Sequence, residues 1–482
     1  MIRVVSPTDM KAWDRSRIES GIPSKTLMLT AAEGLFDAAM RLRGNLPVTC
    51  ICGSGNNGGD GIALAWLLKK ADVPVRIALI GNPEKMTEDA AYYLSLAKNE
   101  KVPVIYEWES NEPELLVDAI FGVGLDRQVT GRYAALIDRI NASGFPVLAA
   151  DIPSGLDAQS GEILGVAIKA AETVTMQFVK TGLLLGQGRA CAGTIRVQKL
   201  AEEQPFSFER EQFWQEAADV ETLLPPRPFD SHKGRNGHAL LCVGSDRYIG
   251  AALLSSRAAL RSGCGILTAV VPDPVRSAFA TLPEAITVPT GTSGWNEEAC
   301  AVAISALENK NAVGIGCGIG SGNAVPLLEA VLCSGVRAVI DADGLNCLSK
   351  NRDLLNLLHK EIVITPHPGE MARLLSCSVS DVLQDPIAAA TAFPCVTLLK
   401  GATTLVSDGR QLVYCTEGSP ALAKGGSGDV LTGLITGLLA QGLLPFDAAR
   451  AGTYLLGCSA KEAFRLLGER MVLASDVIDA MQ

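Results

Sequence analysis

Glycine occupies three of the four positions 425–428, immediately before an apolar stretch. Glycine allows positive φ angles and lets a ligand approach the backbone without meeting a Cβ atom. In the stretch that follows, apolar side chains recur at the spacing of one helix face, at Leu431, Leu434, Ile435, Leu438 and Leu439. We therefore expect a helix that begins near Asp429. The unpaired N–H groups and the positive dipole end of such a helix form a site for phosphate oxygens.

Asp429 lies at the predicted start of this helix, and two interpretations fit it. An aspartate in the first turn stabilises a helix through its charge. A carboxylate beside a phosphate-binding turn is also placed to act as a catalytic base. The choice between the two depends on what else the chain contains.

A chain of 482 residues exceeds one ordinary hydrophobic core, so we expect two domains of roughly 200–250 residues each. With 48% hydrophobic and 20% charged residues, the composition is typical of a globular protein. The 48 glycines and 24 prolines favour a turn-rich α/β architecture.

Charge and hydropathy argue against several classes of partner. The net charge of −10 argues against nucleic acid, because nucleic-acid surfaces need clustered Lys and Arg. The first ten residues hold no uninterrupted apolar run, so they do not form a signal peptide. The most apolar window, residues 430–446, contains Thr and Gly and is shorter than the roughly 20 apolar residues of a membrane span. We expect a cytoplasmic protein with no membrane partner.

The cysteines and histidines do not form recognisable frameworks. Thirteen Cys occur without a CxxC pair, mostly in apolar surroundings, which favours buried reduced thiols over disulfides. The four His lack the spacing of a structural zinc site.

The first half of the chain alternates short apolar or β-branched segments with helical stretches, a pattern that predicts a parallel sheet covered by helices. The predicted strands are residues 48–52, 75–80, 115–121 and 146–150, and a helix is predicted over residues 62–70. Loops rich in Gly, Asn and Asp follow three of the strands, at residues 53–61, 122–127 and 151–157. Each loop alone is explained by turn chemistry. Their shared position at the carboxyl ends of parallel strands, where ligands bind, predicts a site.

The first of these loops holds Gly53, Gly55 and Gly58 at the spacing of a dinucleotide-binding G-x-G-x-x-G motif. Asn56, Asn57 and Asp60 add side-chain oxygens that this motif lacks. The loop therefore suits a phosphate and a cation.

Taken together, residues 53–61, 121–127 and 151–157 resemble the NAD(P)H-hydrate epimerase family. The resemblance implies a Rossmann-like αβα sandwich that binds the hydrated cofactor NAD(P)HX and a potassium ion (K+). The residues it implies for NAD(P)HX binding are Asn56, Asn57, Gly58, Gly59, Asp60, Gly122, Val123, Gly124, Leu125, Asp126, Arg127, Gln128 and Asp151. The residues it implies for potassium are Asn57, Asp118 and Ser154. Residues 27–34 depart from the family's usual helix start.

The regular pattern stops at a charged, proline-bearing stretch, which predicts an interdomain connector at residues 204–228. The predicted domains are then residues 1–203 and 229–482. The second repeats the alternation of strands and helices, so we expect a second αβα sandwich. Its predicted strands are residues 239–244, 266–271, 312–316, 338–341, 362–365 and 397–400.

The second half resembles the ADP- or ATP-dependent NAD(P)H-hydrate dehydratases, which have a ribokinase-like fold. The matching segments are residues 232–234, 314–320, 341–346, 365–370, 400–404 and the glycine-rich turn at 425–428. The nucleotide-binding residues that the resemblance implies are Lys400, Gly401, Ala402, Thr403, Thr404 and Gly428, and the NAD(P)HX contacts are Ala252, Gly318, His367 and Asp429. Cys317 stands where the family usually has Pro, and Gly344 where it usually has Ala. His367, between two prolines, also fits a purely conformational role.

The two resemblances imply a repair reaction in two parts. Phosphorylating the ring hydroxyl of NAD(P)HX turns it into a good leaving group, with Asp429 as the base that accepts the hydroxyl proton. ADP is the implied phosphoryl donor, ATP is the alternative, and Glu370 is placed to help hold magnesium (Mg2+) through water. In the first domain, one carboxyl serves as acid and then base to interconvert the epimers, and Asp151 is our choice.

Two other functions fit the same motifs. The glycine turn and its aspartate would equally phosphorylate a vitamin alcohol such as hydroxyethylthiazole. Alternatively, the first domain is a non-catalytic binding or oligomerisation module whose polar loops only shape turns. We also expect a homo-oligomer.

Overall fold

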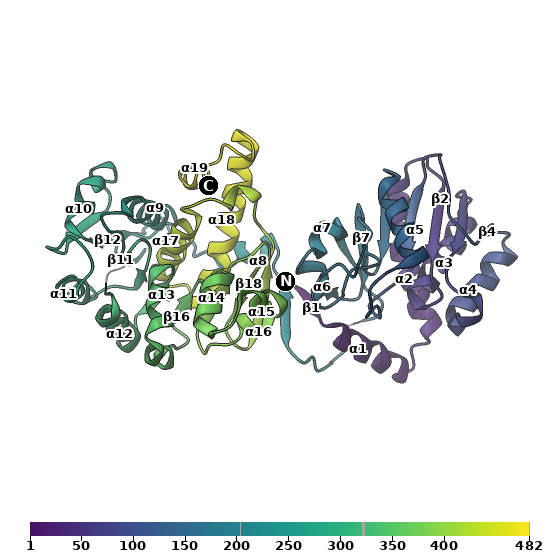
Figure 1. Cartoon of the computed structure of the whole chain (residues 1–482), viewed down its shortest axis with the longest axis horizontal. Coiled ribbons are helices and arrows are strands. Elements are labelled where there is room, and N and C mark those ends of the chain that lie inside the picture. The colour runs from purple at the N-terminus through teal and green to yellow at the C-terminus, as the bar shows by residue number, and fades with distance from the viewer. Residues whose placement is uncertain (203, 321–322, 482) are drawn as a thin grey trace. The chain divides into compact units, whose positions relative to one another are not determined.

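The computed structural model describes residues 1–202, 204–320 and 323–481, and the chain divides into two compact units, Ile2–Glu209 and Arg210–Gln482 (Figure 1). The division falls inside the stretch 204–228 that the sequence marks as a connector. Strand β10 (Glu211–Trp214) and helix α8 (Ala217–Glu221) of that stretch belong to the second unit. Residue 203, the predicted end of the first domain, lies outside the described residues.

The N-terminal unit is built on a parallel sheet with the strand order β4-β3-β2-β5-β6-β7-β9. Its strands are β2 (Val48–Cys52), β3 (Val75–Leu79), β4 (Val104–Ile105), β5 (Leu115–Ala119), β6 (Val147–Ala150), β7 (Glu172–Met176) and β9 (Thr194–Gln198). The four predicted strands are confirmed to within two residues. A separate parallel pair joins β1 (Ile2–Val5) to β8 (Val179–Lys180).

Helices cover both faces of this sheet. Successive strand residues point to opposite sides, and both sets are apolar, so each face packs against helices. Cys50 and Cys52 pack in one cluster with helices on their side, whereas Ile51 belongs to the cluster on the other side. The first cluster contains α2 (Ser24–Arg43), α3 (Asn56–Lys70) and α4 (Glu88–Asn99), and the second contains α5 (Gly131–Ala142). The remaining helices of the unit are α1 (Pro7–Glu19), α6 (Thr181–Leu184), α7 (Gly188–Ala192) and the short η1 (Pro83–Lys85).

Helix α3 begins at Asn56, six residues before the predicted start at residue 62, so that prediction was wrong. Its glycines allow close packing. A Cβ atom on Gly58 would lie 2.2 Å from the Gly53 carbonyl oxygen, and one on Gly59 would lie 2.5 Å from the Met28 side chain. The Asn and Gly residues at the start of α3 have low helix propensity, so the sequence did not predict this first part of the helix, which tertiary packing stabilises.

The C-terminal unit has the strand order β13-β12-β11-β14-β15-β16-β17-β18-β19-β10. Neighbours from β13 to β17 are parallel, and β18 is antiparallel to both β17 and β19. Its strands are β11 (His238–Cys242), β12 (Ile266–Val271), β13 (Ile286–Pro289), β14 (Ala312–Ile315), β15 (Arg337–Ile340), β16 (Ile362–Ile364), β17 (Val396–Leu399), β18 (Thr404–Ser407) and β19 (Gln411–Cys415), with β10 at the edge. The six predicted strands are confirmed to within two residues at each end.

One face of this sheet packs against α9 (Ile249–Arg261), α17 (Ser427–Ala440) and α18 (Pro445–Leu467). On the opposite face, α13 (Asp343–Lys350) brings Gly344 against Ile340. The other helices are α10 (Asp273–Arg276), η2 (Ser277–Thr281), α11 (Glu297–Ser305), α12 (Val325–Ser334), η3 (Arg352–Leu357), α14 (Pro368–Leu375), α15 (Val379–Gln384), α16 (Pro386–Ala390), η4 (Pro420–Leu422) and α19 (Ala474–Asp479). The predicted fold class, two αβα sandwiches, is confirmed. Among the described helices, none combines the length and the apolar character of a membrane span.

Helix α17 is buried from Val430 to Ala440, and glycine lets it approach α9 closely. A Cβ atom on Gly433 would lie 2.0 Å from the Ser255 carbonyl oxygen, and one on Gly437 would lie 2.0 Å from the Ser262 hydroxyl. The helix begins at Ser427, after Gly426 at a φ of +98°. This packing fixes the N-terminus of α17 at the carboxyl edge of the sheet.

We predict that Gly433→Ala lowers the free energy of unfolding by about 3 kcal/mol, because the added methyl group has no space against backbone. Gly250→Ala, on the exposed side of α9 where a Cβ atom meets nothing within 4 Å, is the matched control. It should stabilise by about 0.5–1 kcal/mol through helix propensity alone. Urea denaturation of both variants measures the difference, and equal stabilities would contradict the packing argument.

Candidate active sites

The N-terminal unit contains a cavity of about 570 Å³ at the carboxyl ends of β2, β5 and β6. The chain passes from β2 to β3 on one side and returns to β5 on the other, so the cavity lies where the strand order reverses, the usual ligand position in such sheets. Predicted site residues that line it are Asn56, Asn57, Asp60, Gly122, Val123, Gly124, Leu125, Asp126, Arg127 and Asp151. Three predicted residues, Gly58, Gly59 and Gln128, are absent from the lining.

Asp118, Ser154 and Asn57, the residues predicted to hold a cation, form one connected group beside the cavity. The Ser154 hydroxyl donates to Asp118 Oδ1 (2.6 Å), and the Ser154 N–H donates to Asp118 Oδ2 (2.7 Å). The Asn57 amide nitrogen donates to the Phe121 carbonyl (2.9 Å), which leaves its buried Oδ1 without a partner among the described residues. Burial raises the pKa of Asp118 to about 6, although the hydrogen bonds from Ser154 act to lower it. A buried oxygen with no donor, next to a carboxylate and a hydroxyl, has the chemistry of a cation site.

Asp151 follows β6 at a φ of +65°, in the left-handed region that aspartate rarely occupies. Its Oδ1 atom accepts a hydrogen bond from the fully buried Lys180 ammonium. The same oxygen accepts from the Met176 N–H (3.0 Å) and the Thr175 hydroxyl (3.2 Å). Asp151 Oδ1 thus accepts from three donors, one of which is a buried positive charge, so the carboxyl group is held in one orientation.

Burial disfavours the charged form of two other carboxyl groups in the cavity lining, those of Asp60 and Asp14. Burial raises the pKa of Asp60 well above its usual value, and the Asp151 charge raises it further. Burial also raises the pKa of Asp14 to about 6, partly offset by Lys180.

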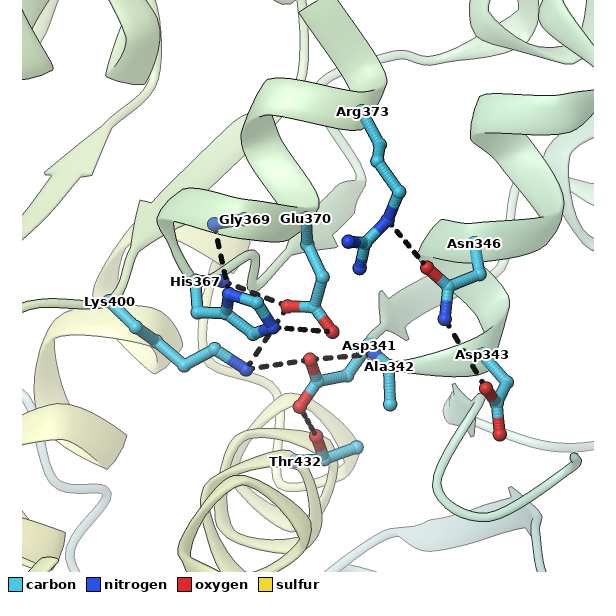
Figure 2. Close-up of polar contacts among 10 residues, drawn as sticks. All are labelled: Asp341, Ala342, Asp343, Asn346, His367, Gly369, Glu370, Arg373, Lys400 and Thr432. Atoms are coloured by element: carbon cyan, nitrogen blue, oxygen red, sulfur yellow. Dashed lines mark hydrogen bonds and ion pairs between the residues drawn. The ribbon is translucent and has the colours of Figure 1, made fainter. Parts of the chain in front are cut away.

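The centre of the C-terminal site is an ion pair between Lys400, after β17, and Asp341, after β15 (Figure 2). Lys400 Nζ and Asp341 Oδ1 are 2.8 Å apart, and Asp341 is 1% exposed. Asp341 also accepts from the Thr432 hydroxyl of α17 (2.8 Å) and from the Ala342 N–H (2.8 Å). Burial acts to lower the pKa of Lys400, but Asp341 and Glu370 outweigh it and the pKa is raised. The ammonium charge is therefore fixed at this edge of the sheet.

His367 caps α14, and its backbone N–H donates to Glu370 (2.8 Å) while its Nδ1 accepts from the Gly369 N–H (3.0 Å). Glu370 lies between the His367 ring, at 3.6 Å, and Lys400, at 3.8 Å (Figure 2). His367 thus has the conformational role that the sequence left open. Its ring remains half exposed beside two charged groups.

Asp429 lies in the first turn of α17, one residue after Gly428. A Cβ atom on Gly428 would stand 3.5 Å from Asp341 and 3.6 Å from Lys400, so the backbone of the turn passes directly beside the ion pair. Burial raises the pKa of Asp429 to about 6, and a hydrogen bond from the Cys317 thiol opposes the rise. Cys317, where the family usually has Pro, therefore contacts the predicted base directly.

Comparison with known proteins agrees with this division into two sites. Residues 24–182 match the family model for the YjeF-related protein N-terminus, and residues 239–482 match the model for NAD(P)H-hydrate dehydratase. The bifunctional NAD(P)H-hydrate repair enzyme Nnr of Vibrio cholerae is 36% identical over 87% of this chain and 85% of its own. This chain belongs to the bifunctional NAD(P)H-hydrate repair enzyme family. The resemblance predicted for both halves is confirmed.

Other relatives of the repair enzyme family match along nearly the whole chain. The Coxiella burnetii enzyme is 36% identical over 97% of this chain and 96% of its own. The ADP/ATP-dependent NAD(P)H-hydrate dehydratase of Bacillus subtilis, crystallised with ATP and magnesium, is 29% identical and covers 57% of this chain and 96% of its own, with a TM-score of 0.48.

The remaining residues predicted from the repair enzyme family lie around the C-terminal site. Ala252 is fully buried in α9 under Gly244, and a Cβ atom on Gly318 would meet Tyr248 at 2.6 Å. The predicted nucleotide residues Gly401, Ala402 and Thr403 form the turn between β17 and β18, and Thr404 begins β18. Gly344 lies in α13 rather than in a loop, where a Cβ atom would stand 2.9 Å from the Ile340 side chain.

Sequence analysis missed two charged residues, Lys180 and Asp14. It also missed the role of Asp341 in pairing with Lys400. Lys180 follows an apolar stretch, and its partner Asp151 is 29 positions away, so no local pattern connects them. Asp341 was within a recognised motif but received no role. The signal available for it was its position directly after a buried strand.

We predict that Asp341→Asn weakens nucleotide binding at least tenfold and lowers the free energy of unfolding by about 2 kcal/mol, because it leaves the Lys400 charge unpaired. Asp353→Asn, at an exposed position of the same unit, is the control and should change neither quantity. Equilibrium ADP binding and urea denaturation measure the two effects. Normal ADP affinity in Asp341→Asn would show that the ion pair has no part in the site.

Proposed function

We propose that this repair enzyme interconverts the R and S epimers of NAD(P)HX at the N-terminal cavity and dehydrates the S epimer to NAD(P)H at the C-terminal site. The observation that carries the proposal is Asp429, a half-buried carboxyl in the first turn of α17, beside a glycine backbone and a fixed Lys400 ammonium. These are the parts of a phosphoryl-transfer site: N–H donors, a positive charge and a base.

In the dehydratase half, Lys400, the turn at residues 401–404 and Gly428 hold the nucleotide phosphates. Asp429 accepts the proton of the ring hydroxyl as that oxygen attacks the terminal phosphorus atom of the nucleotide. The ring nitrogen lone pair then expels the phosphate, and loss of a ring proton restores the double bond of NAD(P)H. Ala252, Gly318 and His367 surround the nicotinamide in this proposal.

The phosphoryl donor is ADP or ATP, and we favour ADP. Magnesium accompanies the nucleotide and neutralises phosphate charge. Hard carboxylate oxygens suit this ion, and Glu370 next to Lys400 is placed to hold it through water.

Potassium fits the group formed by Asn57, Asp118 and Ser154. The buried Asn57 Oδ1 without a described partner supplies an oxygen ligand that the protein itself does not use. The ion would supply positive charge next to the NAD(P)HX phosphates. Asn56, Asp60 and residues 122–128 line or border the rest of the ligand position.

In the epimerase half, loss of the C6 hydroxyl leaves a planar cation, and water returns on either face. Asp151 lies nearest to this chemistry in our proposal. Its carboxylate, held in place by the ion pair with Lys180, stabilises the ring cation.

A coupled assay tests the whole function. Mixed NADHX epimers incubated with this protein, ADP and magnesium should be converted completely to NADH with release of free phosphate. A phosphorylated product that accumulates without NADH would instead support a small-molecule alcohol kinase. Failure of the isolated N-terminal unit to bind NADHX would support a non-catalytic module.

We predict that Asp429→Asn lowers nucleotide-dependent NADH recovery roughly 100-fold or more, the usual contribution of a positioned base, while ADP still binds. Because the base must be ionised, the wild-type rate should rise as pH increases through about 6. Epimer interconversion serves as the internal control and should not change. Near-normal turnover of Asp429→Asn would remove Asp429 from the mechanism.

We predict that Asp151→Asn makes NADH recovery biphasic. The S epimer should react at the normal rate, after which recovery should follow the spontaneous epimerisation of the R form. Stopped time courses starting from mixed epimers, with ADP and magnesium present, reveal the two phases. A single fast phase would exclude Asp151 from the epimerase.

A cytoplasmic location and a homo-oligomeric state remain predictions from the sequence. Gel filtration with light scattering tests the second.

A further inference from the structure

Asp14 is a carboxyl group of the N-terminal cavity that the scheme above does not use. It lies on α1, and Met10, Asp14 and Ile18 all line the cavity. Residues four apart lie on the same helix face, so Asp14 is in the middle of the face that α1 presents to the ligand. Among the described residues, none forms a hydrogen bond or ion pair with its carboxyl group.

Helix α1 is anchored next to Lys180. Strand β1 precedes it directly and pairs with β8, placing Val5 opposite Lys180. The buried Trp13 packs edge-on against Phe178, with ring centroids 5.5 Å apart. Because Asp14 follows Trp13, its position relative to Lys180 and Asp151 is set by a strand pair and an aromatic contact.

The two carboxyl groups on opposite elements of the cavity have different environments. Asp151 is paired with Lys180 and accepts two further hydrogen bonds, which hold its carboxyl group in one orientation. At Asp14 burial dominates and raises the pKa to about 6, Lys180 acts against it and Asp151 adds to it. The other charged groups that line the cavity are Lys11, Asp60, Asp89, Asp126 and Arg127. Two carboxyls with unlike environments divide acid and electrostatic roles between them.

We propose that Asp14, and not Asp151, is the group that carries the proton in epimerisation, while Asp151 and Lys180 hold a fixed carboxylate toward the ring cation. The proposal rests on the proposed epimerase function.

The step balances with water alone. The Asp14 carboxylic acid gives its proton to the C6 hydroxyl, the C6–O bond breaks, and water leaves. The lone pair of the ring nitrogen forms a C=N bond to C6. A water molecule then adds to either face of C6, the C=N electrons return to nitrogen, and the proton lost by that water restores the acid at Asp14.

The test follows interconversion of purified NADHX epimers by the full chain without nucleotide, after subtraction of the spontaneous rate. Wild-type kcat/KM should fall as pH rises through about 6, because the acid must be protonated. Asp14→Asn should lower kcat at least 100-fold and leave the equilibrium Kd for NADHX within a few-fold. Asp14→Glu should recover part of the rate and keep the falling limb.

Arg15→Gln, on the exposed side of α1, is the matched control and should keep the wild-type rate. Urea denaturation verifies that the N-terminal unit of each variant is folded, because the dehydratase site lies in the other unit and does not report on it. If Asp14→Asn is too unstable to assay, the pH dependence of epimerisation by Asp14→Glu tests the assignment instead. If the wild type interconverts the epimers and Asp14→Asn does so at the same rate, Asp14 is not the proton carrier, although the proposed epimerase function stands. A pH profile of Asp14→Glu without the falling limb would lead to the same conclusion. No epimerisation by the wild type overturns the proposed function as well.

Discussion

The close approach of α17 to α9 is the constraint on which the C-terminal site depends. Gly433 and Gly437 leave no room for side chains at the crossing, so the backbone of α17 is held against α9 and over the centre of the sheet. Its N-terminus is thereby fixed, and Thr432 reaches Asp341 from it. Gly428 and Asp429 are then in place beside Lys400. A phosphate-binding helix end needs this immobility, because catalysis by oriented N–H groups depends on their being in position before the reaction.

Each of the two units has the same arrangement of charged groups at the edge of its sheet. Each pairs a lysine with an aspartate that directly follows a strand: the fully buried Lys180 with Asp151, and the partly buried Lys400 with Asp341. In each case a further carboxyl group stands apart from the pair with its pKa raised by burial, Asp14 in the first unit and Asp429 in the second. In each unit one carboxyl group is thus held by an ion pair, while the other has a pKa near 6 and is able to exchange a proton near neutral pH.

The strands that sequence analysis found are those with continuous β-branched or apolar runs, such as β2 and β12. Strand β7 was missed because Glu172 and its threonines look exposed, although Glu172 is buried and pairs with the distant Arg41 and Arg196. The start of α3 was missed because glycine and asparagine have low helix propensity, and only the contact with Met28 explains them. Motifs located Asp429, Asp118 and Ser154, since each lies in a local pattern. Lys180 and Asp14 could not be found in this way, because the cavity and the ion pair to which they belong are formed by distant parts of the chain.

The position of α1 has a consequence for dissecting the protein. The family model for the first domain begins at residue 24, after α1, so a domain boundary drawn from that match omits the helix. Yet α1 contributes Met10, Asp14 and Ile18 to the cavity wall, and Trp13 covers Phe178. A fragment of the N-terminal unit that started at residue 24 would keep the seven strands of the sheet but would have an open, solvated cavity. The leading segment of this chain is therefore part of the first active-site domain, and not an appendage that can be removed or freely replaced by a tag.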